Sequence, residues 1–304
     1  MKKIISITIY LLCFNSIIFA QETKPSETVK QWKSKFQSGL NINQASFSDN
    51  WKSGGVNSVS WNALLNYNLN FNNEYFEWTN DFQSNYGNVK NKDQGMRKNS
   101  DRIFFDSKLS YKISKSWRLF GSANFMSQFD NGFDYSKKSV LDGSDSSIKI
   151  SGFFAPAYLT EAVGFEYKPI DWFSAQIGVG ALRQTFVTDQ SLYDISGKTS
   201  LYGVDKGQNI RNQFVFQFVA EFNKEVMKNI TVKARYAGIA DYQKLNSQGF
   251  VHRLDLNILA KVNKYINTSI GTVVLYDYDQ DKNVQYSQLL SIGFLYTLKN
   301  YEEK

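Results

Sequence analysis

Apolar and polar side chains alternate along this chain with a period of two. From Trp61 to Phe71 the odd positions are apolar, and most of the even positions between them are Asn. Such a period is typical of a β-strand with one apolar face and one polar face. The pattern restarts after Asn72-Asn73, so residues 57–71 and 75–87 predict a β-hairpin with a short Asn-rich turn.

The same alternation recurs and predicts about twelve strands in all. They are expected at 32–45, 57–71, 75–87, 101–113, 117–129, 157–168, 172–187, 209–223, 229–242, 250–262, 265–278 and 285–298. Most run past ten residues, whereas strands of globular proteins usually have about five or six. A tilted strand that crosses a membrane needs about 9 to 11.

The predicted connections alternate between short and long. Short ones are expected at 72–74, 114–116, 169–171, 224–228 and 263–264, and longer ones at 46–56, 88–100, 130–156 and 188–208. This rhythm is typical of the turns and extracellular loops of an outer-membrane barrel. The sequence therefore predicts an all-β fold, a transmembrane antiparallel up-and-down β-barrel over residues 32–298, with both termini periplasmic. A soluble β-sandwich or lipocalin-like fold remains the alternative, because alternation alone does not say which face meets water.

Aromatic residues gather near the ends of the predicted strands, on the apolar face. This placement is typical of the aromatic girdles at the two membrane interfaces. The candidates are Trp61, Phe71, Trp78, Tyr86, Tyr111, Trp117, Tyr167, Trp172 and Tyr276.

The N-terminal residues 1–20 have the features of a secretory signal peptide: Lys2-Lys3, an apolar stretch and Ala20 before Gln21. Segment 21–31 is then expected in the periplasm, and 299–304 form a polar tail. Cleavage would remove Lys2 and Lys3, lowering the formal charge from +7 to +5, and would remove Cys13, the single cysteine. A chain without thiols has no disulfide and no cysteine nucleophile. Its basic residues are interspersed with acids, which argues against nucleic acid as a partner.

Charged residues occupy the polar face and, in a membrane barrel, would line the lumen. The candidates are Glu77, Asp81, Arg102, Asp106, Lys108, Arg118, Glu221, Lys233, Arg235, Arg253, Asp255 and Lys261; Lys112, Glu166 and Asp277 share their parity. Opposed charges of this kind either line a pore for small solutes or pair with each other and fill the interior. Twelve strands lie between the filled eight-stranded barrels and the open sixteen-stranded ones. A narrow or partly occluded lumen is favoured, and the long loops near 130–156 and 188–208 are the candidates for a plug.

Other sites are weakly supported. His252 is the single histidine, and no Ser or acid partner stands at the spacing of a lipid-hydrolysing or peptide-hydrolysing site. The run DYDQDKN (277–283) offers oxygen ligands for Ca²⁺ but lacks the glycine and terminal glutamate of a calcium loop. Gly178 and Gly180 stand inside a strand, where glycine eases curvature. We expect no catalytic residue, no metal site and no cofactor.

Three stretches resemble one family: FSDNWKSGGVNSVSWNALLNYNLNF (47–71), RIFFDSKLSYKISKSWRLFGSANF (102–125) and FFAPAYLTEAVGFEYKP (153–169). The chain is similar, roughly from Trp32 to Leu298, to Gram-negative outer-membrane proteins catalogued as domain of unknown function 3078. The most specific parts are WKSGG and FFAPAYLT. The resemblance implies an outer-membrane β-barrel and implies no activity, since a fold alone does not define function.

These observations favour a non-enzymatic barrel of the outer membrane that acts as a narrow or gated channel for small polar solutes. The alternative is a structural or assembly component that binds a protein partner through its loops, and an outer-membrane hydrolase is third. The expected partners are the outer-membrane bilayer with its lipopolysaccharide and the barrel assembly machinery.

Overall fold

The computed structural model of the protein describes residues 32–48, 56–135, 147–263 and 265–301. Its barrel strands are β1 (Trp32–Ala45), β2 (Ser58–Asn72), β3 (Phe76–Asn91), β4 (Met96–Lys112), β5 (Trp117–Ser127), β8 (Ala157–Ile170), β9 (Phe173–Phe186), β12 (Ile210–Met227), β13 (Ile230–Asp241), β14 (Phe250–Lys261), β15 (Ile266–Asp277) and β16 (Asp281–Lys299). The predicted signal peptide 1–20, the segment 21–31 and the WKSGG motif lie outside the described residues.

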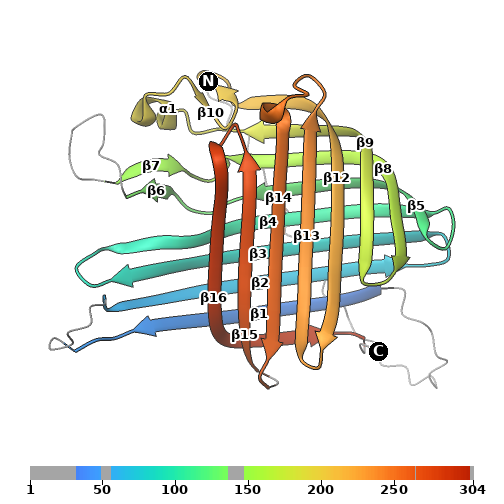
Figure 1. Ribbon diagram of the computed structural model, residues 1–304, viewed down its shortest axis with the longest axis horizontal. Helices are drawn as coiled ribbons and strands as arrows, with labels where there is room; N and C mark the ends of the chain where they lie inside the picture. The colour runs from blue at the N-terminus through green and yellow to red at the C-terminus, as the bar shows by residue number, and fades with distance from the viewer. Residues whose placement is uncertain (1–31, 49–55, 136–146, 264, 302–304) are drawn as a thin grey trace, which may run out of the picture. The chain divides into compact units, whose positions relative to one another are not determined.

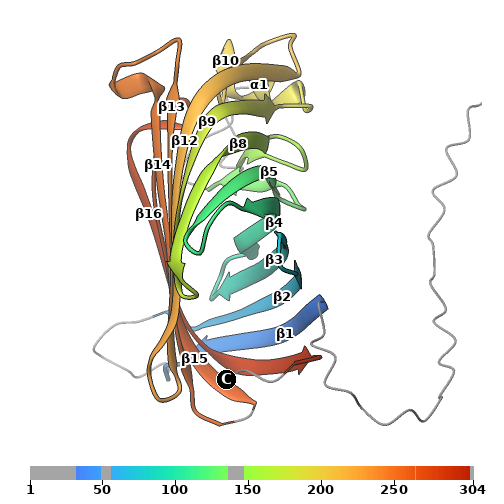
Figure 2. The same ribbon diagram turned by 90° about the vertical axis from the view of Figure 1, so that its right-hand side faces the viewer.

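These twelve strands form one closed antiparallel barrel, in which each strand pairs with its neighbours in the barrel and β16 pairs with β1. Figure 1 shows β12 to β16 side by side, and Figure 2 shows the sheet curving from them round to β1–β5. Closure removes the free sheet edges that a bilayer does not tolerate. The predicted all-β barrel of about twelve antiparallel strands is confirmed.

The first and last strands bring the two ends of the barrel chain to one side. Trp32 is paired with Phe71, next to the turn between β2 and β3, and Lys35 is paired with Lys299. We call this side, which carries the short turns, the turn end, and the opposite side the loop end. The periplasmic position of the turn end stays a prediction.

The predicted long loop at 88–100 is wrong. The ladder between β3 and β4 continues through a register shift at Gly87/Asn88, so the connection is only residues 92–95. Likewise β16 begins at Asp281 rather than near 285. In both places backbone pairing continues beyond the regular apolar alternation, into stretches whose side chains are mainly polar.

The apolar face of the strands points outward. In β12, Phe214 is 65% exposed while its neighbour Val215 is fully buried, and the six even positions from Tyr286 to Tyr296 in β16 contain five exposed large hydrophobic side chains. The reverse would hold in a soluble barrel, where the apolar face is the core. The outside of this barrel is therefore suited to lipid and the inside holds the polar residues.

The described parts of the long connections at the loop end contain secondary structure of their own. They contain β6 (Gly132–Asp134), β7 (Ile148–Ser151), α1 (Ser191–Ser196), β10 (Ser200–Leu201), β11 (Val204–Asp205) and the short helix η1 (Ser247–Gly249). None of these elements was predicted. Neither helix of the described chain is long and apolar enough to cross a membrane.

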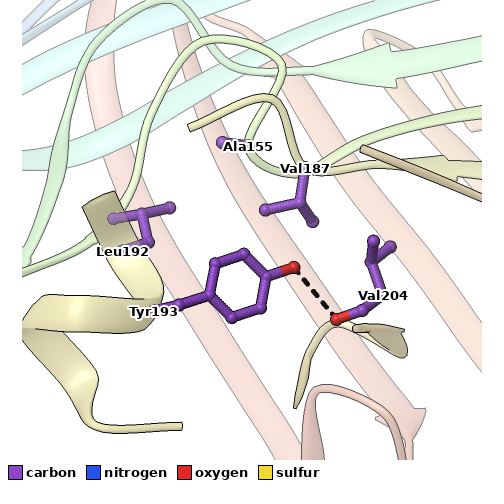
Figure 3. Packing of buried hydrophobic residues seen from close by; sticks show 5 residues of the cluster. All are labelled: Ala155, Val187, Leu192, Tyr193 and Val204. Carbon is purple, nitrogen blue, oxygen red and sulfur yellow. Dashed lines mark hydrogen bonds between the residues drawn. The ribbon is translucent and has the colours of Figure 1, made fainter. Parts of the chain in front are cut away.

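Residues 148–156 and 187–209 pack together into what we call the loop lobe. Figure 3 shows its buried cluster, in which Tyr193 lies among Ala155, Val187, Leu192 and Val204 and donates its hydroxyl to the Val204 carbonyl at 2.9 Å. The hydroxyl of Tyr202 donates to the Ile150 carbonyl at 2.8 Å, which joins the two segments. Burial raises the pKa of Tyr202 to about 12, so this donor stays protonated.

Candidate functional site in the barrel lumen

The structure places the predicted lumen residues on the inner face of the barrel. The parity of the register assigns Glu77, Asp81, Arg102, Asp106, Lys108, Arg118, Glu221, Lys233, Arg235, Arg253, Asp255 and Lys261 to this face. Lys261 is the last residue of β14 and is exposed at the turn end. The role of these residues in function stays a prediction.

A group of five charged residues from β3, β4, β5 and β8 forms what we call the turn-end network. Glu166 Oε1 accepts from Lys108 Nζ at 2.5 Å, and Glu166 Oε2 lies 4.0 Å from Arg118 Nε. Glu77 accepts from Lys168 Nζ at 2.6 Å and lies 3.2 Å from Arg118 Nε. Three bases thus meet two acids, and the side chain of Glu166 is only 2% exposed.

Closer to the loop end, Arg102, Arg235 and Arg253 gather around Asp255. Arg253 binds Asp255 through two hydrogen bonds of 2.7 Å each, which is the bidentate arrangement that guanidinium and carboxylate groups favour. Arg102 Nη1 lies 3.5 Å from the same carboxylate. Arg235 Nε instead binds Glu221 at 3.2 Å.

Phe104 is an aromatic residue on this polar inner face. It is 4% exposed, and its ring centroid lies 4.5 Å from the guanidinium carbon of Arg102 and 5.6 Å from that of Arg235. A guanidinium over an aromatic face is attracted to it and loses freedom of movement. Phe104 therefore holds two of the arginines in place from one side.

These arginines line a cavity in the lumen, which we call the arginine cavity. Its volume is about 70 Å³, and eight strands contribute to its wall. Its charged and hydroxyl-bearing lining residues are Arg102, Arg183, Arg235, Arg253, Asp277, Tyr158 and Thr160. The cavity exceeds the ~10–15 Å³ that a cavity needs to hold one water molecule.

Arg183 was missed by the sequence analysis because a bulge inverts the parity of β9. The ladder between β9 and β12 shifts register between Val215 and Gln217, where Gly178 and Ala181 are the successive partners. After the bulge, the odd-numbered residues of β9 face the lumen, whereas the pattern before the bulge places the even-numbered residues there. The closely spaced Gly178 and Gly180 were the signal for it.

Arginine-to-aspartate pairs mark the rim of the lumen at the loop end. Arg183 Nη2 binds Asp277 at 2.9 Å, and Arg211 Nη1 binds Asp279 at 2.5 Å. The carboxylate oxygens that a calcium ion at DYDQDKN (277–283) would need are therefore already bound by guanidinium groups at two of these aspartates. Across the described residues, no group of three or more His, Cys, Asp or Glu is placed to hold a metal ion.

The loop lobe contacts this rim through Gly203. A Cβ atom at this position would collide with Arg211 Nη1 and would lie 2.8 Å from Asp279 Oδ2. Gly203 also has a φ of +79°, a conformation that favours glycine. The backbone of the lobe therefore rests directly on an ion pair of the lumen wall.

The nine predicted interface aromatics lie at outward-facing positions, in two groups. Near the turn end, the rings of Trp117 and Tyr167 are 5.0 Å apart, as are those of Trp32 and Phe71. Near the loop end, Trp61 and Tyr86 are 5.8 Å apart. Trp78, Tyr111 and Trp172 belong to the first group and Tyr276 to the second.

His252 belongs to the second aromatic group. Its Nδ1 is hydrogen-bonded to the Tyr236 hydroxyl at 2.7 Å, and its ring lies near those of Phe250 and Tyr276. The register places it on the outer face, opposite Gly238 and Tyr276. Its surroundings are those of an interfacial residue.

The comparisons with known proteins agree with part of this description. Residues 42–133 match the model of a family described as protein of unknown function (DUF3078), which confirms the predicted resemblance over that segment. The FFAPAYLT segment lies beyond the matched residues. No curated protein matches the chain.

Several solved barrel structures are similar in outline. They include the translocator domain of the autotransporter NalP from Neisseria meningitidis (TM-score 0.36, 9% identity, 89% of this chain and 90% of that one) and the NanC porin (0.39, 10%, 86% and 98%). The KdgM porin is another, with a TM-score of 0.31, 9% identity and 86% and 98% of the two chains covered. With TM-scores below 0.5, these likenesses carry no functional inference.

Proposed function

We propose that the protein is a non-enzymatic outer-membrane barrel whose lumen binds small polar solutes and passes them through a narrow path. The observation that carries this proposal is a charged inner face that encloses the arginine cavity, inside a barrel whose outer face is apolar. Charged rings in a pore select ions by sign, and a narrow path makes that selection strong. The bilayer with its lipopolysaccharide and the barrel assembly machinery are the partners that such a protein requires.

The lumen is narrowed by its own side chains and by the loop lobe. Ion pairs cross the interior between strands that are distant in sequence, such as Arg102 with Asp255 and Arg183 with Asp277. Because Gly203 rests on the rim, movement of the lobe would widen the entrance. This arrangement supports a gated channel over a permanently open pore.

The test is single-channel conductance of the refolded mature protein in a planar bilayer, with Arg235→Ala and Asp255→Ala beside it. We expect steady conductance, a shift of selectivity toward cations for Arg235→Ala and a shift toward anions for Asp255→Ala, because each substitution removes a lining charge. Lys228→Ala, in the exposed turn between β12 and β13, serves as the control for charge loss outside the lumen. A folded barrel that never conducts would contradict the channel proposal.

The second candidate is a component that docks a protein partner through its loops. It is favoured by the loop lobe, which has its own buried cluster around Tyr193. Stoichiometric co-purification of a second protein with the native barrel, lost when residues 187–209 are replaced by a Gly/Ser linker, would support it. A barrel that purifies alone would weigh against it.

A further inference from the structure

The arginine cavity has more guanidinium groups than carboxylates to bind them. Four arginines line it, and the single acid in the lining, Asp277, is already bound by Arg183. Asp255 is not among the residues that line the cavity, and both of its oxygens are engaged with Arg253. The space itself is therefore bordered mainly by positive charge.

Arg102 is the arginine least satisfied by the protein. Among the described residues, three buried side-chain nitrogens lack a hydrogen-bond partner: Arg102 Nε, Arg118 Nε and Gln285 Nε2. Arg118 Nε still lies 3.2 Å from a Glu77 oxygen, whereas the ion pair of Arg102 is a 3.5 Å approach by Nη1 to a carboxylate that Arg253 already holds. A buried donor without an acceptor is unfavourable unless a bound molecule supplies one.

Neutral groups in the wall complement these arginines. The Tyr158 hydroxyl accepts from Gln280 Nε2 at 3.0 Å, which leaves its own proton available to a ligand. Arg183 lies over the Tyr158 ring at 5.0 Å, so the tyrosine and the arginine are held together at the loop-end side of the cavity. Phe104 fixes Arg102 and Arg235 from another side, which keeps their donors in place before a ligand arrives.

We propose that the arginine cavity is a binding site for a small oxyanion, a carboxylate or an inorganic anion of similar size, held by Arg102 with Arg235 and Arg253. The planar guanidinium fork matches the paired oxygens of such a group. A volume of about 70 Å³ is sufficient for a small anionic group. This inference rests on the proposed function and names the class of solute that the lumen recognises.

The experiment is calorimetric titration of sodium nitrate into the refolded, detergent-solubilised barrel. A parallel titration of sodium chloride at the same concentrations corrects for the change in ionic strength. We expect saturable one-site binding, and a Kd at least tenfold weaker for Arg102→Gln, which corresponds to about 1.4 kcal/mol. Arg97→Gln is the matched control, because Arg97 lies over the Tyr135 ring outside the cavity.

A second variant covers the case in which Arg102→Gln does not fold. Ala237 lines the cavity from β13, and Ala237→Leu fills the space without changing any charge. We expect this variant to lose nitrate binding. Its far-ultraviolet circular-dichroism spectrum should remain that of the wild type, because the strands still form. Absence of saturable binding in the wild type, or equal weakening in Arg97→Gln, would overturn the proposal.

Failure of the site and failure of the channel are distinguishable. If the barrel conducts ions but does not bind nitrate, the channel function is supported and the anion site is contradicted. If the barrel binds nitrate through Arg102 but does not conduct ions in the bilayer, the anion site is supported and the channel function is contradicted.

Discussion

At the turn end of the lumen, Glu166 lies almost fully buried between Lys108 and Arg118, whereas toward the loop end Arg102 has a buried Nε without a hydrogen bond. Both regions are built from bases and acids at alternate positions of neighbouring strands. In the turn-end network each carboxylate is shared by two bases. In the arginine cavity the guanidinium groups surround a space.

The difference between the two regions lies in the pairing of their charges. A buried charge is costly unless a partner compensates it, and each base of the turn-end network has a carboxylate oxygen within 3.2 Å. The arginine cavity leaves part of this compensation to a molecule from outside. We therefore propose structural stabilisation for the turn end and recognition for the loop end.

The largest effect is expected from breaking the turn-end network with Glu166→Ala. This substitution leaves Lys108 without its closest acid, at 2.5 Å, in a buried position. Removing one partner of a buried ion pair typically costs about 3–5 kcal/mol. The free energy of unfolding from urea titration of the barrel in lipid vesicles measures the loss.

Glu161→Ala is the matched control for Glu166→Ala. Glu161 is in the same strand, β8, but points outward and borders a depression of about 370 Å³ beside Gly121 and Phe214. A carboxylate on the lipid face is unfavourable, so its removal is expected to be neutral or stabilising. Equal destabilisation by both variants would refute the distinction between the two faces.

An intermediate effect is expected when the loop lobe is lifted from the rim by Gly203→Val. The new side chain would collide with Arg211 in addition to the strain of a φ of +79°. Backbone strain alone costs about 1–3 kcal/mol. We expect faster protease cleavage within residues 187–209 while the barrel itself remains resistant.

Gly207→Val is the control for Gly203→Val. Gly207 has a φ of +87°, yet nothing lies within 4 Å of its added Cβ. Both variants share the backbone strain, so the difference in their cleavage rates isolates the collision at the rim. Identical rates would show that the rim contact does not hold the lobe.

The smallest effect is expected from pH, through the pair of Lys149 and Asp189 that joins the two segments of the loop lobe. Lys149 Nζ donates to Asp189 Oδ2 at 2.7 Å, and this hydrogen bond, with that from Ser191, lowers the pKa of Asp189. A lowered folded-state pKa means that the stabilisation is present above the unfolded pKa of about 4 and is lost as pH falls through the lower folded value.

Hydrogen exchange of the α1 amides at pH 7 and at pH 3 measures this change. We expect a loss of less than about 1 kcal/mol, because the pair is partly exposed. Exchange free energies are compared after correction for the intrinsic pH dependence of exchange. Lys149→Gln should remove most of the difference between the two pH values, and a full difference in that variant would assign the effect to another carboxylate.

The strands were largely predictable because their signal is local. The predicted 32–45 coincides with β1, and the predicted 117–129 overlaps β5 with the same start at Trp117. Parity also placed Glu77 and Arg118 together on one face. Lys168 shares the parity of Glu166 in the same strand but was not among the predicted lumen residues. The alternation is a property of neighbouring residues, so it can be recognised in the sequence without knowledge of the fold.

Arg183 and Phe104 were not predicted as parts of a site. The position of Arg183 depends on a register shift set by the paired strand. Phe104 shares the parity of Arg102 and Asp106, but its role on the inner face becomes evident only from its two arginine neighbours in the structure. The loop lobe was missed because its buried cluster joins Ala155 to Tyr193 across a long separation in sequence.

The sequence by itself determined that this chain makes long antiparallel strands with one apolar and one charged face, since side-chain alternation follows directly from strand geometry. Only the tertiary structure decided that the apolar face is outside, which acids the lumen bases meet, and that Arg102 lacks a full complement of acceptors. These features depend on closure and on register across the barrel, where residues far apart in the chain become neighbours.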